Sequence, residues 1–244
     1  MKWNIIHLDE TDSTNRWLRE HGVGDMVVVA DYQTAGRGCG TNRWESERGR
    51  NLLFSVLLHP TDVPAARQFC ISQAVAVTLC ETLEEYLGED RVQVKWPNDI
   101  YVGGRKIAGI LIENRLQQGC IKDSIVGIGL NVNQWQFVSD APNPVSLCQL
   151  LGHEVDREEL LMRILRRNTM YSYKEYDVFS AGKRWFLIGK PALFQDRDGR
   201  FTATITGVEP DGRLVMTDAG GRERRYGFKE VQFVLDSRNT DMPE

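Results

Sequence analysis

The sequence lacks a long apolar run. No stretch approaches the ~20 residues that a membrane-spanning helix needs, and the first residues do not follow the signal-peptide pattern. The five cysteines, at positions 39, 70, 80, 120 and 148, include no Cys-x-x-Cys pair. These absences argue against a membrane protein and against a disulfide-rich secreted domain, so we expect a cytoplasmic protein with free thiols.

Signals for a structural metal or for nucleic acid are also missing. The four histidines have no zinc-ligand spacing. A net charge of −4 argues against a genome-binding protein, and no nucleophile motif of a serine or cysteine hydrolase stands out. The composition is that of an ordinary globular protein, with 41% hydrophobic and 26% charged residues in a chain of 244. This length allows one large domain and one small one.

Apolar and alternating runs predict an α/β (α+β) fold with a mixed sheet flanked by helices. Besides a strand at the N-terminus, strands are predicted at residues 26–31, 51–58, 91–96, 107–113 and 124–133. Helix signals lie at residues 12–22, 64–88 and 156–171. The first helix has Asp12 or Ser13 as its cap, and the third begins with Asp156 in capping-box spacing. Cys70 and Cys80 fit the apolar face of the second helix, which predicts core positions.

Beyond Gly189 the pattern changes to short strands separated by tight turns. They are predicted at residues 190–194, 201–208, 213–218, 222–226 and 231–235. Five short strands of this kind favour a small β-barrel. We therefore divide the chain into a large domain at 1–186, a small domain at 187–236 and a polar tail at 237–244.

A glycine-rich loop with arginines follows the strand at 26–31. Gly36, Gly38 and Gly40 lie among the cations Arg37 and Arg43, and the loop closes on a tryptophan. Glycines let the backbone N–H groups approach an anion closely, and arginine adds a planar fork of donors. The loop is a candidate site for a carboxylate or phosphate, although a solvated surface loop has the same composition.

A second group of candidate residues lies further along the chain. The segment Lys95-Trp96-Pro97-Asn98-Asp99 ends a strand at its proline. The following Gly103-Gly104 pair predicts a hairpin turn, which places Lys106 near the tip. In the strand at 124–133, glycines clear space on one face, and Asn131 and Asn133 are expected to point to the same side.

Together these motifs resemble the biotin protein ligases, that is, biotin–[acetyl-CoA-carboxylase] ligases. The matching segments follow the family's order over roughly the first two thirds of the chain; they are Asp12–Asn15, Gln33–Gly38, Trp44, Lys95–Asp99, Arg105–Leu111 and Gly127–Asn131. The resemblance implies a class II synthetase-like biotin/lipoate ligase catalytic domain at 1–186 and an SH3-like barrel at 187–236. It also implies the short form of the family, which lacks an N-terminal DNA-binding domain.

The resemblance implies a reaction in two steps. Biotin's carboxylate attacks the α-phosphate of ATP to give biotinoyl-5′-AMP and pyrophosphate, with Mg²⁺ neutralising part of the triphosphate. A lysine of a biotin carboxyl carrier protein then attacks the adenylate. The expected partners are this carrier, biotin and ATP, without nucleic acid or membrane, and a homodimer is possible because sheet-edge dimers occur in the family.

The resemblance also implies a role for each matching residue. Lys106 and Arg37 would be catalytic, because both would stabilise the reacting anions. Biotin would be bound by Ser13, Thr14, Asn15, Gln33, Gly36, Arg37, Gly38, Cys39, Trp44, Lys106 and Gly109. The nucleotide would be bound by Arg43, Asn98, Asp99 and Asn131, with Asp99 also a candidate Mg²⁺ ligand.

Structural roles compete with several of these assignments. Ser13 and Thr14 fit helix capping alone, Trp44 fits a packed aromatic, and Lys106 fits a solvated hairpin lysine. Asn98 and Asp99 fit a turn after the proline. In the small domain, the basic group Arg222, Arg224 and Arg225 fits a solvated strand face, with docking of an acidic carrier domain as the weaker hypothesis.

One departure from the family pattern affects the loop. Many relatives carry arginine directly after Gly-Arg-Gly and again three residues later, where this chain has Cys39 and Asn42. We hypothesise that the chain therefore holds biotinoyl-AMP less tightly, with Arg43 compensating in part. A Cys39→Arg variant that releases the adenylate at the native rate would contradict this hypothesis.

Two other functions remain open from the sequence. A lipoate–protein ligase or octanoyltransferase would share the fold, although the Lys95–Asp99 block and Gly36-Arg37-Gly38 favour biotin. A non-catalytic nucleotide- or biotin-binding module would bind the ligands without turnover. The acid that supports ATP cleavage separates these possibilities.

Overall fold

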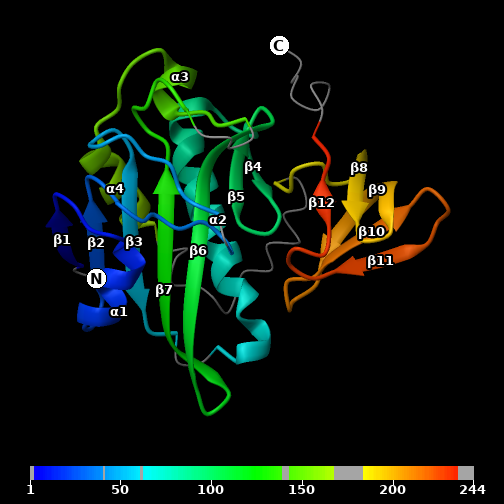
Figure 1. Cartoon of the computed structure of the whole chain (residues 1–244), viewed down its shortest axis with the longest axis horizontal. Helices are drawn as coiled ribbons and strands as arrows, with labels where there is room; N and C mark the ends of the chain where they lie inside the picture. The colour runs from blue at the N-terminus through cyan, green and yellow to red at the C-terminus, as the bar shows by residue number, and fades with distance from the viewer. Residues whose placement is uncertain (1–2, 41, 61–62, 139–142, 168–183, 236–244) are drawn as a thin grey trace.

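The computed structural model describes residues 3–40, 42–60, 63–138, 143–167 and 184–235. The predicted tail at 237–244 and the predicted end of the third helix at 168–171 lie outside the described residues. Figure 1 shows a large sheet with helices packed against it and a smaller sheet at its side. This arrangement confirms the predicted mixed sheet flanked by helices.

The large sheet has seven strands in the order β1-β2-β3-β7-β6-β5-β4. β1 and β2 are parallel, and all other neighbours are antiparallel. The strands are β1 Asn4–Leu8, β2 Met26–Ala30, β3 Leu52–Leu58, β4 Val92–Lys95, β5 Asp99–Val102, β6 Arg105–Gln117 and β7 Cys120–Leu130. The helices are α1 Thr14–His21, the 3₁₀ turn η1 Ala65–Arg67, α2 Phe69–Leu87, α3 Leu147–Leu151 and α4 Arg157–Arg166.

The predicted strands are confirmed, with some ends moved. β7 ends at Leu130, so Asn131 and Asn133 follow the strand and do not share a face. Asn133 donates to the backbone oxygen of Val155 at 2.9 Å, whereas Asn131 donates to that of Val145 at 3.0 Å. The same-side prediction was wrong because period-two alternation holds only inside a strand.

The two faces of the large sheet have different partners. On β3, Phe54 and Val56 belong to the main core with α2 and α4, whereas Leu57 joins a second cluster with Leu18 of α1. Ser55 shares the α1 side of β3 and is fully buried. Burial of a large apolar side chain contributes roughly 1.5–3 kcal/mol, so both clusters stabilise the sheet and fix α1 against it.

α2 is the central helix of the helical layer. Fourteen of its nineteen residues are buried, because β4 and β5 contact it as well as α3 and α4. The predicted core positions Cys70 and Cys80 are confirmed, and burial raises the pKa of Cys80 to about 12. None of the helices in the described ranges combines the length and the apolar character needed to cross a membrane.

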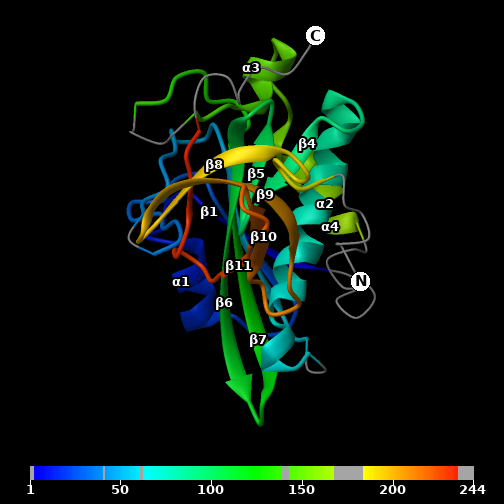
Figure 2. The ribbon, with the colours of Figure 1, turned by 90° about the vertical axis from the view of Figure 1, so that its right-hand side faces the viewer.

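The small sheet has five antiparallel strands in the order β11-β10-β9-β8-β12, as predicted in number and position. They are β8 Pro191–Asp196, β9 Gly199–Val208, β10 Leu214–Asp218, β11 Glu223–Tyr226 and β12 Gln232–Phe233. Figure 2 shows that the strands of the small sheet curve strongly. The fully buried ring of Phe194 packs against Phe201 and Phe233.

Several contacts join the small sheet, and the chain that enters it, to the large sheet. The indole N–H of Trp96 donates to the backbone oxygen of Gly212 at 2.8 Å. Along β4, the backbone N–H of Val94 donates to Arg184 at 2.7 Å, and Phe186 donates back to Val94 at 2.9 Å. The Lys95–Asp99 block therefore lies where the two sheets meet.

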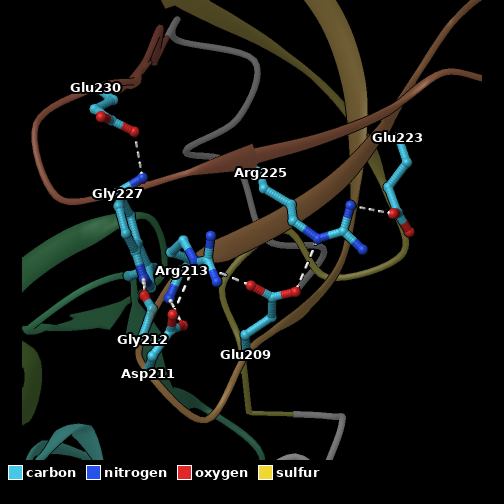
Figure 3. A network of polar contacts seen from close by, with 9 residues as sticks. Glu209, Asp211, Gly212, Arg213, Glu223, Arg225, Gly227 and Glu230 are labelled. Atoms are coloured by element: carbon cyan, nitrogen blue, oxygen red, sulfur yellow. Dashed lines mark hydrogen bonds and ion pairs between the residues drawn. The ribbon is translucent and has the colours of Figure 1, made fainter. Parts of the chain in front are cut away.

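Two of the three arginines in the predicted basic group, Arg224 and Arg225, are paired with carboxylates, whereas Arg222 is exposed. Arg224 donates to Asp218 at 2.8 Å and lies over the ring of Phe201. Arg225 bonds to Glu209 at 2.8 Å and to Glu223 at 2.6 Å, within the network of Figure 3. The predicted solvated face is wrong for Arg224, which is half-buried. Carrier docking by the three arginines stays a hypothesis, but the pairing neutralises much of the charge of Arg224 and Arg225.

We expect Asp123 to make stability depend on acid pH. Its carboxylate accepts hydrogen bonds from His59 at 2.8 Å and from Arg115 at 2.6 Å. Burial opposes its ionisation, but these bonds outweigh burial and hold the pKa of Asp123 below its usual value. The resulting stabilisation is fully present above pH ~4, the ordinary aspartate pKa, and is lost as the pH falls through the lower folded-state pKa.

The Asp123→Asn variant is therefore expected to lose roughly 1.5–3 kcal/mol of unfolding free energy at pH 7. The difference from the native protein should shrink below pH ~4, because the native carboxylate is then protonated too. Denaturant unfolding at pH 7 and pH 3 measures both, with exposed Asp198→Asn as the control. An equal loss at both pH values would contradict the ionic origin.

Candidate functional site

One cavity of about 1080 Å³ lies on the α1 side of the large sheet. Its walls come from the start of α1, the loop at 37–45, strands β4 to β7, and residues 228–233 of the small sheet. The predicted site residues that line it are Ser13, Thr14, Asn15, Gln33, Arg37, Gly38, Cys39, Arg43, Trp44, Asn98, Asp99, Lys106, Gly109 and Asn131. Segments far apart in the sequence thus meet in a single cavity.

Gly36 is the predicted site residue outside this lining. It is buried, and its carbonyl accepts from the backbone N–H of Trp44 at 3.1 Å. A Cβ at this position would lie 3.1 Å from the Trp44 oxygen and 3.3 Å from Gln33 Nε2. The glycine therefore lets the two ends of the loop pack closely, and it supports the site from behind.

A set of neutral polar groups forms the floor of the cavity at α1. Ser13 occupies the N-cap position, but its side chain makes no cap hydrogen bond, so capping does not account for this hydroxyl. The backbone N–H of Thr14 donates to Gln33 Oε1 at 2.8 Å. Asn15 donates to Glu113 at 2.9 Å and is 5% exposed. These groups are neutral donors and acceptors held on a rigid helix end.

Ser55 connects this floor and was not predicted. Its hydroxyl donates to Asn15 Oδ1 at 2.6 Å and lies 2.7 Å from Thr14 Oγ1. It is fully buried in β3. The available signal was a lone serine inside the apolar run 52–58, because a buried hydroxyl in such a strand needs a polar partner.

Trp44 covers the sheet beside this floor. Its ring lies against the backbone of Gly129 and Gly109, where an added Cβ would come within 2.4 Å and 3.0 Å of ring atoms. The glycines of β6 and β7 thus make room for an indole, which confirms the predicted clearance on one face. The Nζ atom of Lys106 lies 5.5 Å from the centre of the same ring.

The loop at 36–44 closes on itself beside Trp44. The backbone N–H of Gly38 donates to the backbone oxygen of Asn42 at 2.8 Å. The backbones of Arg37 and Arg43 form an isolated antiparallel β-bridge. Both arginine side chains are exposed on the cavity wall. The predicted concentration of positive charge on this loop is therefore present at the cavity.

Lys106 and Asp99 form an ion pair at 2.6 Å on the wall made by β5 and β6. The β5–β6 hairpin brings them together, and its turn at Gly103 and Gly104 has positive φ at both residues, as predicted. Asp99 is the first residue of β5 and pairs with Gly109, so the turn interpretation of Asp99 was wrong. Lys106 is half-buried, which also differs from a fully solvated hairpin lysine.

Asn98 and Asn131 hold the backbone around this pair. Asn98 donates to the backbone oxygen of Ile110 at 2.6 Å and to Cys39 Sγ at 3.3 Å. Asn131 donates to Val145, whose N–H in turn donates to the Lys106 oxygen at 2.9 Å. Both amides therefore have structural contacts on the cavity wall.

Cys39 contributes a neutral group to the loop. It is half-buried, and burial raises the pKa of its thiol. Asp99 acts in the same direction, and Lys106 and Lys229 oppose it. The thiol therefore stays protonated at neutral pH and carries no charge toward the cavity.

The small sheet contributes residues that sequence reasoning missed. Lys95 Nζ lies 4.6 Å from the ring centre of Phe233 and 5.4 Å from that of Tyr101, and burial lowers the Lys95 pKa. Phe228 and Lys229 also line the cavity. No local pattern marks these residues, because their contacts with Lys95 and the loop exist only after the sheets meet.

Several known proteins are similar to this chain in sequence. Residues 8–131 match the family model described as the biotin/lipoate A/B protein ligase family. The biotin–[acetyl-CoA-carboxylase] ligase of Paracoccus denitrificans is 29% identical over 231 residues, which cover 88% of this chain and 95% of that protein. The bifunctional ligase/repressor BirA of Salmonella typhimurium is 30% identical over 229 residues, covering 89% and 70% respectively.

A solved structure agrees in fold as well as in sequence. The biotin protein ligase from Aquifex aeolicus, in complex with biotin and ATP, is 29% identical with a TM-score of 0.78. The likeness covers 94% of this chain and 97% of that one. With a matching family model over half of its length and a similar structure over nearly all of it, this chain belongs to the biotin/lipoate A/B protein ligase family.

Proposed function

We propose that this protein activates biotin with ATP and transfers it to a lysine of a biotin carboxyl carrier protein. One observation carries the proposal: the cavity joins a floor of neutral hydrogen-bonding groups to a wall with the Lys106–Asp99 pair and the Arg37 loop. Biotin has this polarity, with a neutral ureido ring at one end and a carboxylate at the other. The named relatives include biotin ligases over most of the chain.

The ureido ring fits the floor at α1. Its carbonyl accepts hydrogen bonds and its two N–H groups donate them, which suits the hydroxyls and amides of Ser13, Thr14 and Asn15. Gln33 is already fixed by Thr14 at 2.8 Å. The Trp44 ring supplies an apolar wall for the thiophane ring and side chain.

The Ser55→Ala variant is expected to bind biotin about tenfold more weakly, because Asn15 and Thr14 lose their shared partner. The measurement is the apparent KM for biotin, together with the thermal midpoint. Ser124→Ala is the matched control, since Ser124 is also fully buried but has no hydrogen-bond partner among the described residues. An unchanged KM in Ser55→Ala would contradict the positioning role.

The carboxylate end would meet the cations. In the first step a carboxylate oxygen bonds to the α-phosphorus of ATP and the bond to pyrophosphate breaks. Lys106 and Arg37 would stabilise the negative charge that gathers there. In the second step a carrier lysine nitrogen bonds to the acyl carbon and AMP leaves. Trp44 and the closed loop would keep water from the adenylate.

Mg²⁺ would enter with the nucleotide. No group of three acidic, histidine or cysteine side chains that could hold a metal occurs among the residues that the structure describes. Mg²⁺ typically needs only one or two carboxylates when phosphates supply other ligands. Asp99 fits this role, because its carboxylate lies on the cavity wall beside Lys106.

The nucleotide would occupy the side of the cavity lined by Arg43, Asn98 and Asn131. The partners we propose are the carrier protein, biotin and ATP, without nucleic acid, in the cytoplasm. A homodimer through a sheet edge and the domain division at 1–186 and 187–236 belong to the same proposal.

ATP–pyrophosphate exchange tests the proposal directly. The native protein is assayed with MgATP and either biotin, lipoate, octanoate or no acid. Exchange with biotin alone supports the proposed activation step, and transfer to a carrier protein then tests the second step. Exchange with lipoate or octanoate would assign the chain to the other branch of its family. Binding of biotin and ATP without exchange would favour a non-catalytic module.

A further inference from the structure

The turn at Gly227–Glu230 of the small sheet has a tightly fixed shape. The backbone N–H of Gly227 donates to the Glu230 carboxylate at 2.6 Å (Figure 3), and the Glu230 N–H donates back to the Gly227 oxygen at 3.2 Å. Lys229 lies inside this turn with φ of +67°. A lysine there is strained relative to glycine, and such strain is concentrated at functional sites.

This turn carries Lys229 to the loop of the large domain. An ideal Cβ on Gly40 would lie 1.9 Å from Lys229 Nζ and 2.6 Å from its Cε, so the ammonium rests against the glycine backbone. Gly40 therefore leaves the space that Lys229 fills. Lys229 also lines the cavity, together with Cys39 and Asn42 of the same loop.

The positive charge of the Lys229 ammonium is available to a bound anion. Within the described part of the chain, no carboxylate forms an ion pair with Lys229, unlike Lys106 or the nearby Arg225. The loop residues that line the cavity between Arg37 and Arg43 are Gly38, Cys39 and Asn42, and none of them carries a charge. Lys229 thus adds an uncompensated cation to the wall between Arg37 and Arg43.

We propose that Lys229 binds the polyphosphate of ATP, so that the small sheet completes the nucleotide site. This inference rests on the proposed function and names a contact for it. A polyphosphate carries several negative charges, and an unpaired ammonium at the cavity wall attracts them strongly. Lys229 is exposed, but a lysine without a ligand would need neither the positive φ nor the contact with Gly40.

The Lys229→Gly variant removes the positive charge of this side chain and keeps the shape of the turn. Glycine suits φ of +67° and leaves the turn bonds of Gly227 and Glu230 in place. We expect about a tenfold weaker ATP affinity, measured by calorimetry and as the KM for ATP in exchange. AMP affinity, the KM for biotin and carrier transfer from preformed biotinoyl-AMP should remain native. Lys229→Arg should stay within about threefold of the native affinity for ATP.

Lys190→Ala is the control, because Lys190 is an exposed lysine next to β8 of the same sheet. An ATP affinity of Lys229→Gly within twofold of the native value would overturn the inference, as would an equal loss of AMP affinity. Calorimetry with ATP does not require turnover. A native protein without biotin-dependent exchange would therefore refute the proposed function while this binding comparison still decides the role of Lys229.

Discussion

Replacement of Lys106 by alanine is expected to lower biotin-dependent ATP–pyrophosphate exchange by about 10³-fold. Lys106 lies where the carboxylate and the α-phosphate would meet, paired with Asp99 at 2.6 Å and held in place by the β5–β6 hairpin. Loss of one preorganised charge at a reacting centre typically costs 10²–10³ in rate. Removing it also leaves Asp99 unpaired against an incoming anion, which adds to the loss.

The neighbouring residue provides a matched control. Arg105 is exposed at the start of the same strand and does not line the cavity, so Arg105→Ala should retain nearly native exchange. Thermal unfolding of both variants checks that the hairpin is intact. Native exchange in a folded Lys106→Ala variant would rule out Lys106 as a catalytic residue and would move the charge stabilisation to Arg37.

The Gly129→Ala variant is expected to lower kcat/KM for biotin by about 100-fold. A Cβ on Gly129 would lie 2.4 Å from Trp44 Cε2, so the indole must move toward the space proposed for biotin. Displacement of a substrate-positioning group by about 1 Å typically costs that much. Overpacking is also expected to lower the free energy of unfolding by roughly 1–3 kcal/mol.

Gly207→Ala is the control for a glycine-to-alanine change that causes no clash, because a Cβ there would meet no atom within 4 Å. Truncating the indole supplies a second test. The Gly129→Ala, Trp44→Ala double variant should bind biotin no more weakly than Trp44→Ala alone, because the clash no longer exists. An additional loss in the double variant would show that Gly129 acts on biotin by another route.

The sequence predicted the parts of the site that local chemistry specifies. The glycines of the loop and the Gly103-Gly104 turn have backbone requirements that few other residues meet. Continuous apolar runs located β2 and β3, because both faces of these strands are buried. β6 was located too, but it continues past the predicted 113 to Gln117, where its side chains are exposed. Of the fifteen site residues named from the family motifs, fourteen line one cavity. Gly36 is the one outside its lining.

Residues whose roles depend on distant partners were missed or misassigned. Ser55 acts through Thr14 and Asn15, which precede it by 41 and 40 positions. Lys229 reaches Gly40 only after the two sheets pack. The N-cap Ser13 was expected to bond its own helix, but it makes no cap bond. Propensity and spacing describe neighbours along the chain, so these contacts across the fold were outside their reach.

The pairing of Val94 with the segment at 184–186 has a consequence for self-association. An unpaired edge strand is a template for adding a strand from another molecule. The chain entering the small sheet occupies the outer edge of β4, through backbone bonds at 2.7 Å and 2.9 Å. Of the two ends of the seven-stranded sheet, β1 is therefore the one that the described chain leaves open. A dimer that continues the sheet from one subunit into the next would therefore add its strand along β1 rather than along β4.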